Sequence, residues 1–121
     1  MAPGARILRR ADTRKAQADW GSLEWVAGEE LGNAEGITVG RVIIRKGQHN
    51  PRHSHPNCEE ALLLLRGRLD HTYGDERVVL EPGDTIVIAP GVAHNAVSVG
   101  EEDAEMIVAY SSGRREFRQE T

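Results

Sequence analysis

The stretch of sequence that decides the fold is His53-Ser-His-Pro-Asn-Cys-Glu-Glu-Ala-Leu-Leu-Leu-Leu65. Its two histidines are separated by one residue, so in a β-strand both side chains point to the same face. The run from Ala61 to Leu65 is apolar at odd and at even positions, which is typical of a strand covered on both faces. The stretch therefore predicts strands around a buried core, with the histidine pair pointing into one small volume.

Two further side chains complete a candidate metal site. Glu60 follows the histidine pair and His94 lies far downstream. Together with His53 and His55 they offer three nitrogen donors and one oxygen donor, which suit a divalent transition metal and leave coordination positions open. Burying these groups without partners would cost several kcal/mol, so we expect them to hold a metal ion or a water network.

Composition limits the function classes. The 121 residues suffice for one domain, and aromatic residues make up only 4% of them, so the core must be mainly aliphatic. The net charge of −4, without any basic stretch, argues against a nucleic-acid partner. The single cysteine, Cys58, rules out an intramolecular disulfide, and we find no signal-peptide or membrane-spanning stretch. We expect a cytoplasmic protein without a membrane partner.

Short runs rich in β-branched residues and leucine follow one another between residues 37 and 110. Glycine- and proline-containing turns separate them, and no helical period lies between them. This pattern predicts an all-β fold, either an antiparallel barrel or a double-sheet jelly roll. We expect strands at residues 37–46, 60–65, 69–73, 78–80, 85–89, 96–99 and 106–110.

The chain divides into three parts on this pattern: an N-terminal arm with the first edge elements (1–36), the barrel core (37–110) and a C-terminal tail (111–121). The first 19 residues are polar and small, so we expect an arm that orders only against something else. The charged residues after position 113 predict a solvated tail. Three core runs are apolar on both faces, and a partner subunit is the natural cover for the outer faces, so we expect a homodimer.

The spacing of the candidate ligands resembles the two motifs of the cupin superfamily. The first motif is matched by Gly47, His53, His55, Glu60 and Gly67 at every spacing. Only Glu60, and not the adjacent Glu59, gives the six-residue step to Gly67, so the resemblance assigns the oxygen ligand to Glu60.

The second cupin motif is matched by Gly83, Gly91 and His94. Two positions depart from it, because Ala89 stands where the motif has proline and Ser98 where it has asparagine. The resemblance implies a small single-domain cupin, a double-stranded β-helix of six or more strands with a Mn, Fe, Ni, Co, Cu or Zn ion inside, and frequent dimers.

Four other residues are weaker candidates. His71 shares its parity with Leu69 and could be a general base near the metal, although a structural histidine explains it as well. Tyr110 could line the barrel or belong to the core. Arg41 and Arg45 could clamp a substrate carboxylate if their face points inward, whereas Val42 and Ile44 on the other parity favour solvated arginines.

Three functions fit these residues. The first is a metal-dependent enzyme acting on a sugar-derived compound, a uronate or an oxo or hydroxy acid, by isomerase or lyase chemistry or by dioxygenation. The second is a non-catalytic ligand-binding or sensory cupin in which the metal helps to hold a sugar or small acid. The third is a structural metal site with function in the dimer surface, which open coordination positions disfavour.

Overall fold

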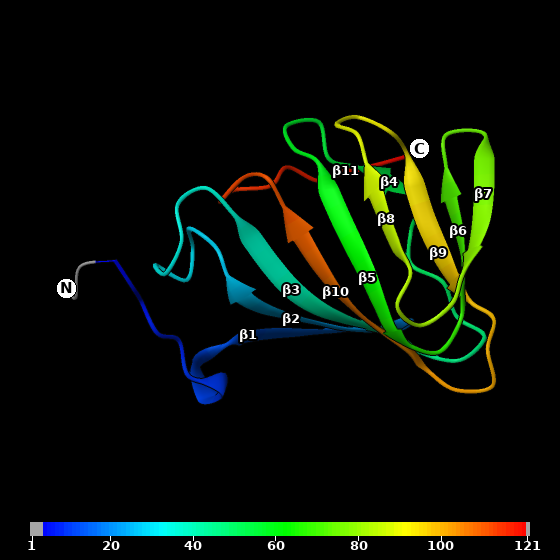
Figure 1. Ribbon diagram of the computed structural model, residues 1–121, viewed down its shortest axis with the longest axis horizontal. Helices are drawn as coiled ribbons and strands as arrows, with labels where there is room; N and C mark the ends of the chain where they lie inside the picture. The colour runs from blue at the N-terminus through cyan, green and yellow to red at the C-terminus, as the bar shows by residue number, and fades with distance from the viewer. Residues whose placement is uncertain (1–3, 121) are drawn as a thin grey trace.

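Two antiparallel β-sheets make up the protein in the computed structural model, which describes residues 4–120 (Figure 1). The larger sheet has six strands, and its order interleaves strands that are distant in the sequence, as the all-β jelly roll expected from the sequence requires. Its strands, in spatial order, are β1 (Arg14–Ala18), β2 (Gly21–Ala27), β3 (Thr38–Ile44), β10 (Ala104–Tyr110), β5 (Glu60–Arg66) and β8 (Thr85–Ile88).

The smaller sheet has five strands and forms the opposite wall (Figure 1). Its register places His53 directly opposite His94, and Tyr73 opposite His94 on the other side. The two strand runs that carry metal-ligand candidates are therefore neighbours, although 41 positions separate them in the sequence. Its strands, in spatial order, are β11 (Arg118–Gln119), β4 (His53–Ser54), β9 (His94–Ser98), β6 (Leu69–Tyr73) and β7 (Glu76–Leu80).

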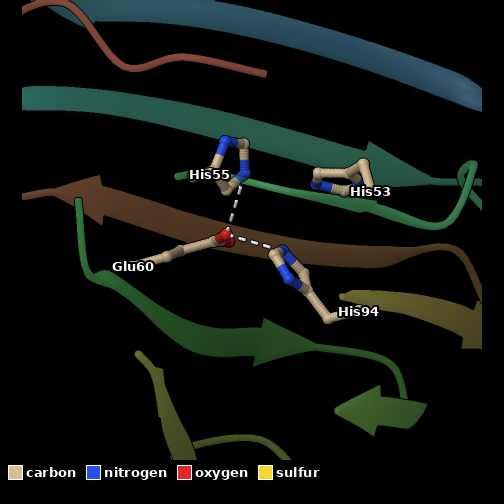
Figure 2. Close-up of side chains that lie close together, drawn as sticks. All are labelled: His53, His55, Glu60 and His94. Atoms are coloured by element: carbon tan, nitrogen blue, oxygen red, sulfur yellow. Dashed lines mark hydrogen bonds and ion pairs between the residues drawn. The ribbon is translucent and has the colours of Figure 1, made fainter. Parts of the chain in front are cut away.

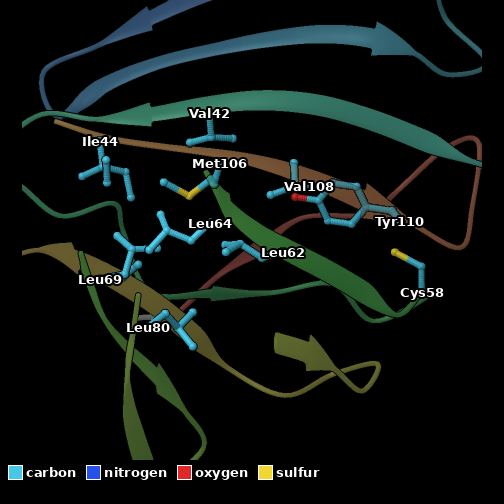
Figure 3. Close-up of a cluster of buried hydrophobic side chains, with 12 residues drawn as sticks. Val42, Ile44, Cys58, Leu62, Leu64, Leu69, Leu80, Met106, Val108 and Tyr110 are labelled. Carbon is cyan, nitrogen blue, oxygen red and sulfur yellow. The ribbon is translucent and has the colours of Figure 1, made fainter. Parts of the chain in front are cut away.

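The core between the sheets is aliphatic, as the low aromatic content predicts. Burial alternates along β3 and β10, because successive side chains point to opposite faces of a strand. Figure 3 shows the resulting cluster, with Tyr110 and Cys58 at one end of it and the leucines towards the other. Its most deeply buried side chains are Ile44, Leu64, Leu69, Met106 and Val108.

The turn between β5 and β6 needs a glycine. Gly67 has a φ of +85°, in the left-handed region that other residues rarely adopt. A Cβ atom at this position would also lie 2.7 Å from the Cα of Ala104. The motif glycine after Glu60 therefore lets β5 reverse direction against the start of β10.

The N-terminal part is more ordered than the sequence indicated. Residues 14–18 form β1, which pairs with β2 of the same chain, and a short 3-10 turn, η1 (Arg10–Asp12), precedes it. The prediction of an arm over the first 19 residues was wrong for these five. Their side chains are polar or small and mostly exposed, so this edge strand lacks the alternation of large apolar residues that reveals a half-buried strand.

The C-terminal part also departs from the prediction of a solvated tail. Residues 111–120, here called the C-terminal segment, run back across the mouth of the barrel, and β11 pairs with β4. Thr38 donates a hydrogen bond to the carbonyl of Ser112 (2.7 Å), and Asn57 donates one to the carbonyl of Arg114 (2.9 Å). The segment is thus tied to the barrel at several points.

Among residues 4–120 there is no helix with the length and hydrophobicity needed to span a bilayer.

Candidate metal centre

Four buried side chains converge inside the barrel near its mouth (Figure 2). His53 lies on β4, His55 just after it, Glu60 at the start of β5 and His94 at the start of β9. One nitrogen or oxygen atom from each residue lies within 4.8 Å of the others. The structure therefore brings together the complete ligand set that the sequence indicated, while Glu59 is exposed.

Backbone carbonyls fix the orientation of all three imidazoles. The Nδ1 atoms donate hydrogen bonds to the carbonyl oxygens of Pro51, Glu116 and Val92, at 2.7 Å from His53, 2.7 Å from His55 and 2.9 Å from His94. A histidine that donates from Nδ1 can offer the lone pair of Nε2 to a metal. All three rings can thus present Nε2 to a common ion.

The interior of the cluster is incompletely satisfied by protein groups alone. His55 Nε2 is buried and makes no hydrogen bond within residues 4–120, although it lies 3.3 Å from Glu60 Oε1. His94 Nε2 lies 2.9 Å from the same oxygen. Nitrogen lone pairs and a carboxylate in one buried volume match the donor preferences of Zn²⁺, Mn²⁺, Fe²⁺ and related ions. These residues therefore fit a divalent metal.

Burial and mutual charge set the protonation of the cluster. Burial raises the pKa of Glu60, but the close approach of the His55 and His94 Nε2 atoms and the charges of both rings outweigh it and lower the pKa well below its usual range. Burial lowers the pKa of His94, yet the hydrogen bond and charge of Glu60 reverse this, so that the pKa is raised. Burial, helped by the charges of His94 and His55, lowers the pKa of His53 to about 4. Glu60 is therefore ionised and His53 neutral near pH 7.

A cavity of about 170 Å³ adjoins the four ligand candidates. Aliphatic side chains such as Val42, Leu62 and Met106 form part of its wall. Its polar lining consists of the ligand candidates together with Asn50, His71, Tyr110 and Arg115. The volume corresponds to roughly five or six waters, at ~30 Å³ each, so the cavity suits a small molecule.

His71 and Tyr110 both lie against this cavity. The His71 ring is stacked on His94 with centroids 5.9 Å apart, and its Nδ1 donates to the carbonyl of Thr72. Burial and the charge of His94 lower the pKa of His71, so its imidazole is neutral near pH 7. Tyr110 is paired with Glu60 across β10 and β5, and burial and the charge of Glu60 raise its pKa well above the usual value. Tyr110 is therefore a neutral phenol.

The C-terminal segment contributes two cavity residues, although the sequence pattern predicted a solvated tail there. Phe117 stacks on His53 with ring centroids 4.8 Å apart. The guanidinium of Arg115 lies 4.5 Å from the Trp25 ring centroid and 5.2 Å from that of Tyr110. The one sequence signal was Phe117 itself, because it is the only phenylalanine of the chain and stands in a charged run.

Arg41 and Arg45 do not take part in the site. Arg41 lies on the outer face of β3, where it pairs with Glu105 at 2.9 Å, and Arg45 is exposed and donates to the carbonyl of Ala18. The parity of β3 explains this, since Val42 and Ile44 occupy the inward positions. Of the two alternatives considered for Arg41 and Arg45, the structure has the one that the parity of Val42 and Ile44 favoured, in which both arginines lie on the solvated face.

The sequence matches a known family and named relatives. The family model described as "Cupin domain" matches residues 40–110. Germin-like protein 3-8 of Oryza sativa subsp. japonica is 35% identical over 85 residues, which cover 66% of this chain and 38% of that protein. Oxalate oxidase 1 of Hordeum vulgare is 31% identical over 88 residues, covering 66% and 44%. The chain thus spans about two fifths of the length of the curated relatives that it matches.

Solved structures show the same fold. A protein of Klebsiella pneumoniae subsp. pneumoniae, described as uncharacterized with a double-stranded beta-helix domain, superposes with a TM-score of 0.77 at 19% identity. The match covers 97% of this chain and 99% of that one. The likeness identifies the arrangement of the two sheets as a double-stranded β-helix.

Proposed function

The chain belongs to the cupin family, and from this premise we propose that it is a metal-dependent enzyme acting on a small, oxygen-rich acid. The observation that carries the proposal is the orientation of His53, His55 and His94, whose Nδ1 atoms all donate to backbone carbonyls. Such bonds hold a ligand set in position before a metal binds. The adjoining cavity leaves room for a substrate on the open side of the site.

The proposed cofactor is one divalent transition ion, such as Mn, Fe, Ni, Zn, Co or Cu. Three neutral imidazoles and the Glu60 carboxylate would leave a divalent ion a net charge of about +1, which favours anionic oxygen ligands. When bound, the ion would supply Lewis-acid polarisation of substrate oxygens or a place for O2 and substrate to meet.

The cavity wall narrows the proposed substrate class. Sugars and uronates carry many hydroxyl groups that need hydrogen-bond partners when buried, and the apolar part of the wall, which includes Val42, Leu62 and Met106, offers none. A short oxo or hydroxy acid can place its oxygens against the ligand candidates and leaves little polar surface against the apolar part of the wall. The 31% identity with an oxalate oxidase supports an acid of this size.

Two protein groups are placed to move protons in this reaction. We propose His71 as the general base, because its Nδ1 donates to Thr72 and its neutral ring leaves Nε2 free to accept a proton. We propose Tyr110 as a hydrogen-bond donor, because its raised pKa keeps the phenol protonated beside Glu60. Both groups line the same cavity.

Metal analysis and turnover assays test the proposal. The protein is purified without added metal and its ions are counted. It is then reloaded singly with Mn, Fe, Co, Ni, Cu or Zn and assayed on oxalate, glycolate, glyoxylate and a uronate, with and without O2. Turnover of a short acid by at least one metal form is expected, and full activity with redox-inert zinc assigns isomerase or lyase chemistry rather than oxygenation. Binding without turnover by any form would favour a ligand-binding or sensory role.

We also propose that the chain forms a homodimer in a reducing, cytoplasmic environment. Leu63, Leu65 and Val87 on the outer faces of β5 and β8 are 38%, 44% and 60% exposed, and a second subunit would cover them. The single buried cysteine suits a reducing compartment. A monomeric mass by light scattering at micromolar concentration would contradict the dimer.

A further inference from the structure

Arg115 lies where the cavity beside the metal ligands meets the protein surface. It lines that inner cavity together with Phe117, and the same two residues also line a groove of about 210 Å³ on the outer side of the C-terminal segment. Trp25, Arg14 and Arg114 form part of that outer groove. Arg115 and Phe117 therefore form the partition between an outer groove and the inner cavity.

The charge of Arg115 has no acidic partner among the residues that the structure describes. No carboxylate between residues 4 and 120 forms an ion pair or hydrogen bond with it, whereas its neighbours on the outer groove are paired. Arg14 binds Glu30 at 2.6 Å, and Arg114 binds Glu29. The groove thus contains two neutralised arginines and one whose N–H groups remain available.

Aromatic rings hold the Arg115 guanidinium in place. Its Cζ lies 4.5 Å from the Trp25 ring centroid, 5.2 Å from that of Tyr110 and 5.9 Å from that of Phe117. Cation–π contacts of this kind restrict the flat face of a guanidinium and leave its N–H edge available. Two parallel N–H groups match the two oxygens of a carboxylate.

The backbone around Arg115 is fixed as well. The carbonyl of Gly113 accepts a hydrogen bond from the N–H of Glu29 at 2.9 Å, and a Cβ atom at Gly113 would lie 2.1 Å from the carbonyl oxygen of Glu35. On the other side, the N–H of Glu116 donates to Asn57 at 2.8 Å. The backbone is therefore anchored on both sides of Arg115, at Gly113 and at Glu116, and this fixes the position of the arginine.

We propose that Arg115 is the carboxylate-binding residue of this site, which receives one carboxylate of a small acid at the cavity mouth while the acid's other oxygens face the metal ligands. This inference rests on the proposed function. It narrows the substrate class of that function to acids with two anionic groups. The structure assigns to Arg115 the role that the sequence had offered to Arg41 and Arg45.

Calorimetric titration of the zinc-loaded protein tests the proposal, because zinc is redox-inert and the readout is binding rather than turnover. The probes are oxalate and succinate, each compared with its monoamide, oxamate and succinamate. Arg115→Met removes the charge and retains an apolar stem against Trp25, and Arg115→Gln is a second neutral variant if Arg115→Met does not fold. Arg115→Lys keeps the positive charge but lacks the two parallel N–H groups of the guanidinium. Arg114→Gln is the matched control on the same segment.

We expect Arg115→Met to weaken binding of at least one dicarboxylate about tenfold to a hundredfold, and its monoamide by about fivefold or less. Arg115→Lys should recover part of the loss, and Arg114→Gln should match the unmodified protein. If dicarboxylates bind the unmodified protein and the neutral variants equally, the Arg115 inference is overturned while the proposed function stands. If the neutral variants lose zinc, Arg115 is structural. If no acid binds the unmodified zinc-loaded protein, both proposals fail.

Discussion

The two sheets bury very different side chains. The inward positions of the six-stranded sheet are almost all aliphatic, as in Ile44, Leu64 and Met106, with Glu60 and Thr38 as the polar exceptions. Four of the seven buried residues on strands of the five-stranded sheet are polar, namely His53, His71, His94 and Ser98. One sheet thus supplies most of the hydrophobic stabilisation, and the other supplies most of the chemistry. Substitutions on each sheet should separate stability from metal binding.

The largest effect is expected on the five-stranded sheet. His94→Ala removes one of four ligands, and structural metal sites are worth ~10–16 kcal/mol in total, so metal affinity should fall by ~3–4 kcal/mol, or several hundredfold. Competition with a chromophoric chelator measures this affinity. The exposed His49→Ala serves as the control and should bind metal normally. Full metal occupancy in His94→Ala would contradict the assignment of this ligand.

The complementary change lies on the six-stranded sheet. Leu64 is fully buried and Leu65, the next residue of β5, is 44% exposed. Leu64→Ala should lower the free energy of unfolding by about 3 kcal/mol, because it leaves a cavity, whereas Leu65→Ala should change it by ~0.5 kcal/mol or less. Urea denaturation in the presence of a chelator measures both. Equal effects of the two substitutions would show that β5 is not buried on one face only.

Acidification should lower the free energy of unfolding of the chelator-treated protein, because histidines of the five-stranded sheet have lowered pKa values. The pKa of His53 is lowered to about 4 and that of His71 is also lowered, so between pH 6.5 and 4.5 the unfolded chain binds more protons than the folded one. Stability should therefore fall by about 2 kcal/mol as the pH falls through this window.

Two further groups of the cluster, His94 and Glu60, do not oppose this trend over the lower part of the window. The raised pKa of His94 gives a contribution to the free energy of unfolding that is present in full once the pH lies below 6.5. The lowered pKa of Glu60 gives a contribution that is lost only as the pH falls below about 4.5. Urea midpoints across the range measure the slope. His53→Gln should flatten it, and an unchanged slope in this variant would contradict the role of His53.

The smallest effect is expected on the outer face of the six-stranded sheet. Arg41→Gln breaks a partly exposed ion pair with Glu105, so stability should fall by at most about 0.5 kcal/mol. Metal affinity and acid binding should not change, because Arg41 lies outside the cavity. If the zinc-loaded variant lost affinity for the acid in a titration, Arg41 would have to take part in acid binding.

Local pattern was sufficient for the parts of the fold that alternate or bury both faces. The expected strand 69–73 coincides with β6, and 85–89 differs from β8 by one residue. The four ligand candidates could be predicted because strand parity and motif spacing are properties of the sequence that directly determine where these side chains point in the folded barrel. β1 was missed because an exposed edge strand has no apolar alternation. Arg115 was missed because its role comes from contacts with Trp25 and Tyr110, which no local pattern encodes.

The hydrogen bond from His55 Nδ1 to the carbonyl of Glu116 joins residues 61 positions apart. During synthesis His55 leaves the ribosome well before Glu116 has been translated. The central strand β10, which lies between β3 and β5, shortly precedes Glu116, so the barrel cannot close before this part of the chain is made, and until then the His55 ring is not oriented. We therefore expect the oriented ligand set to form late in the maturation of the protein, together with closure of the barrel by β10 and the C-terminal segment.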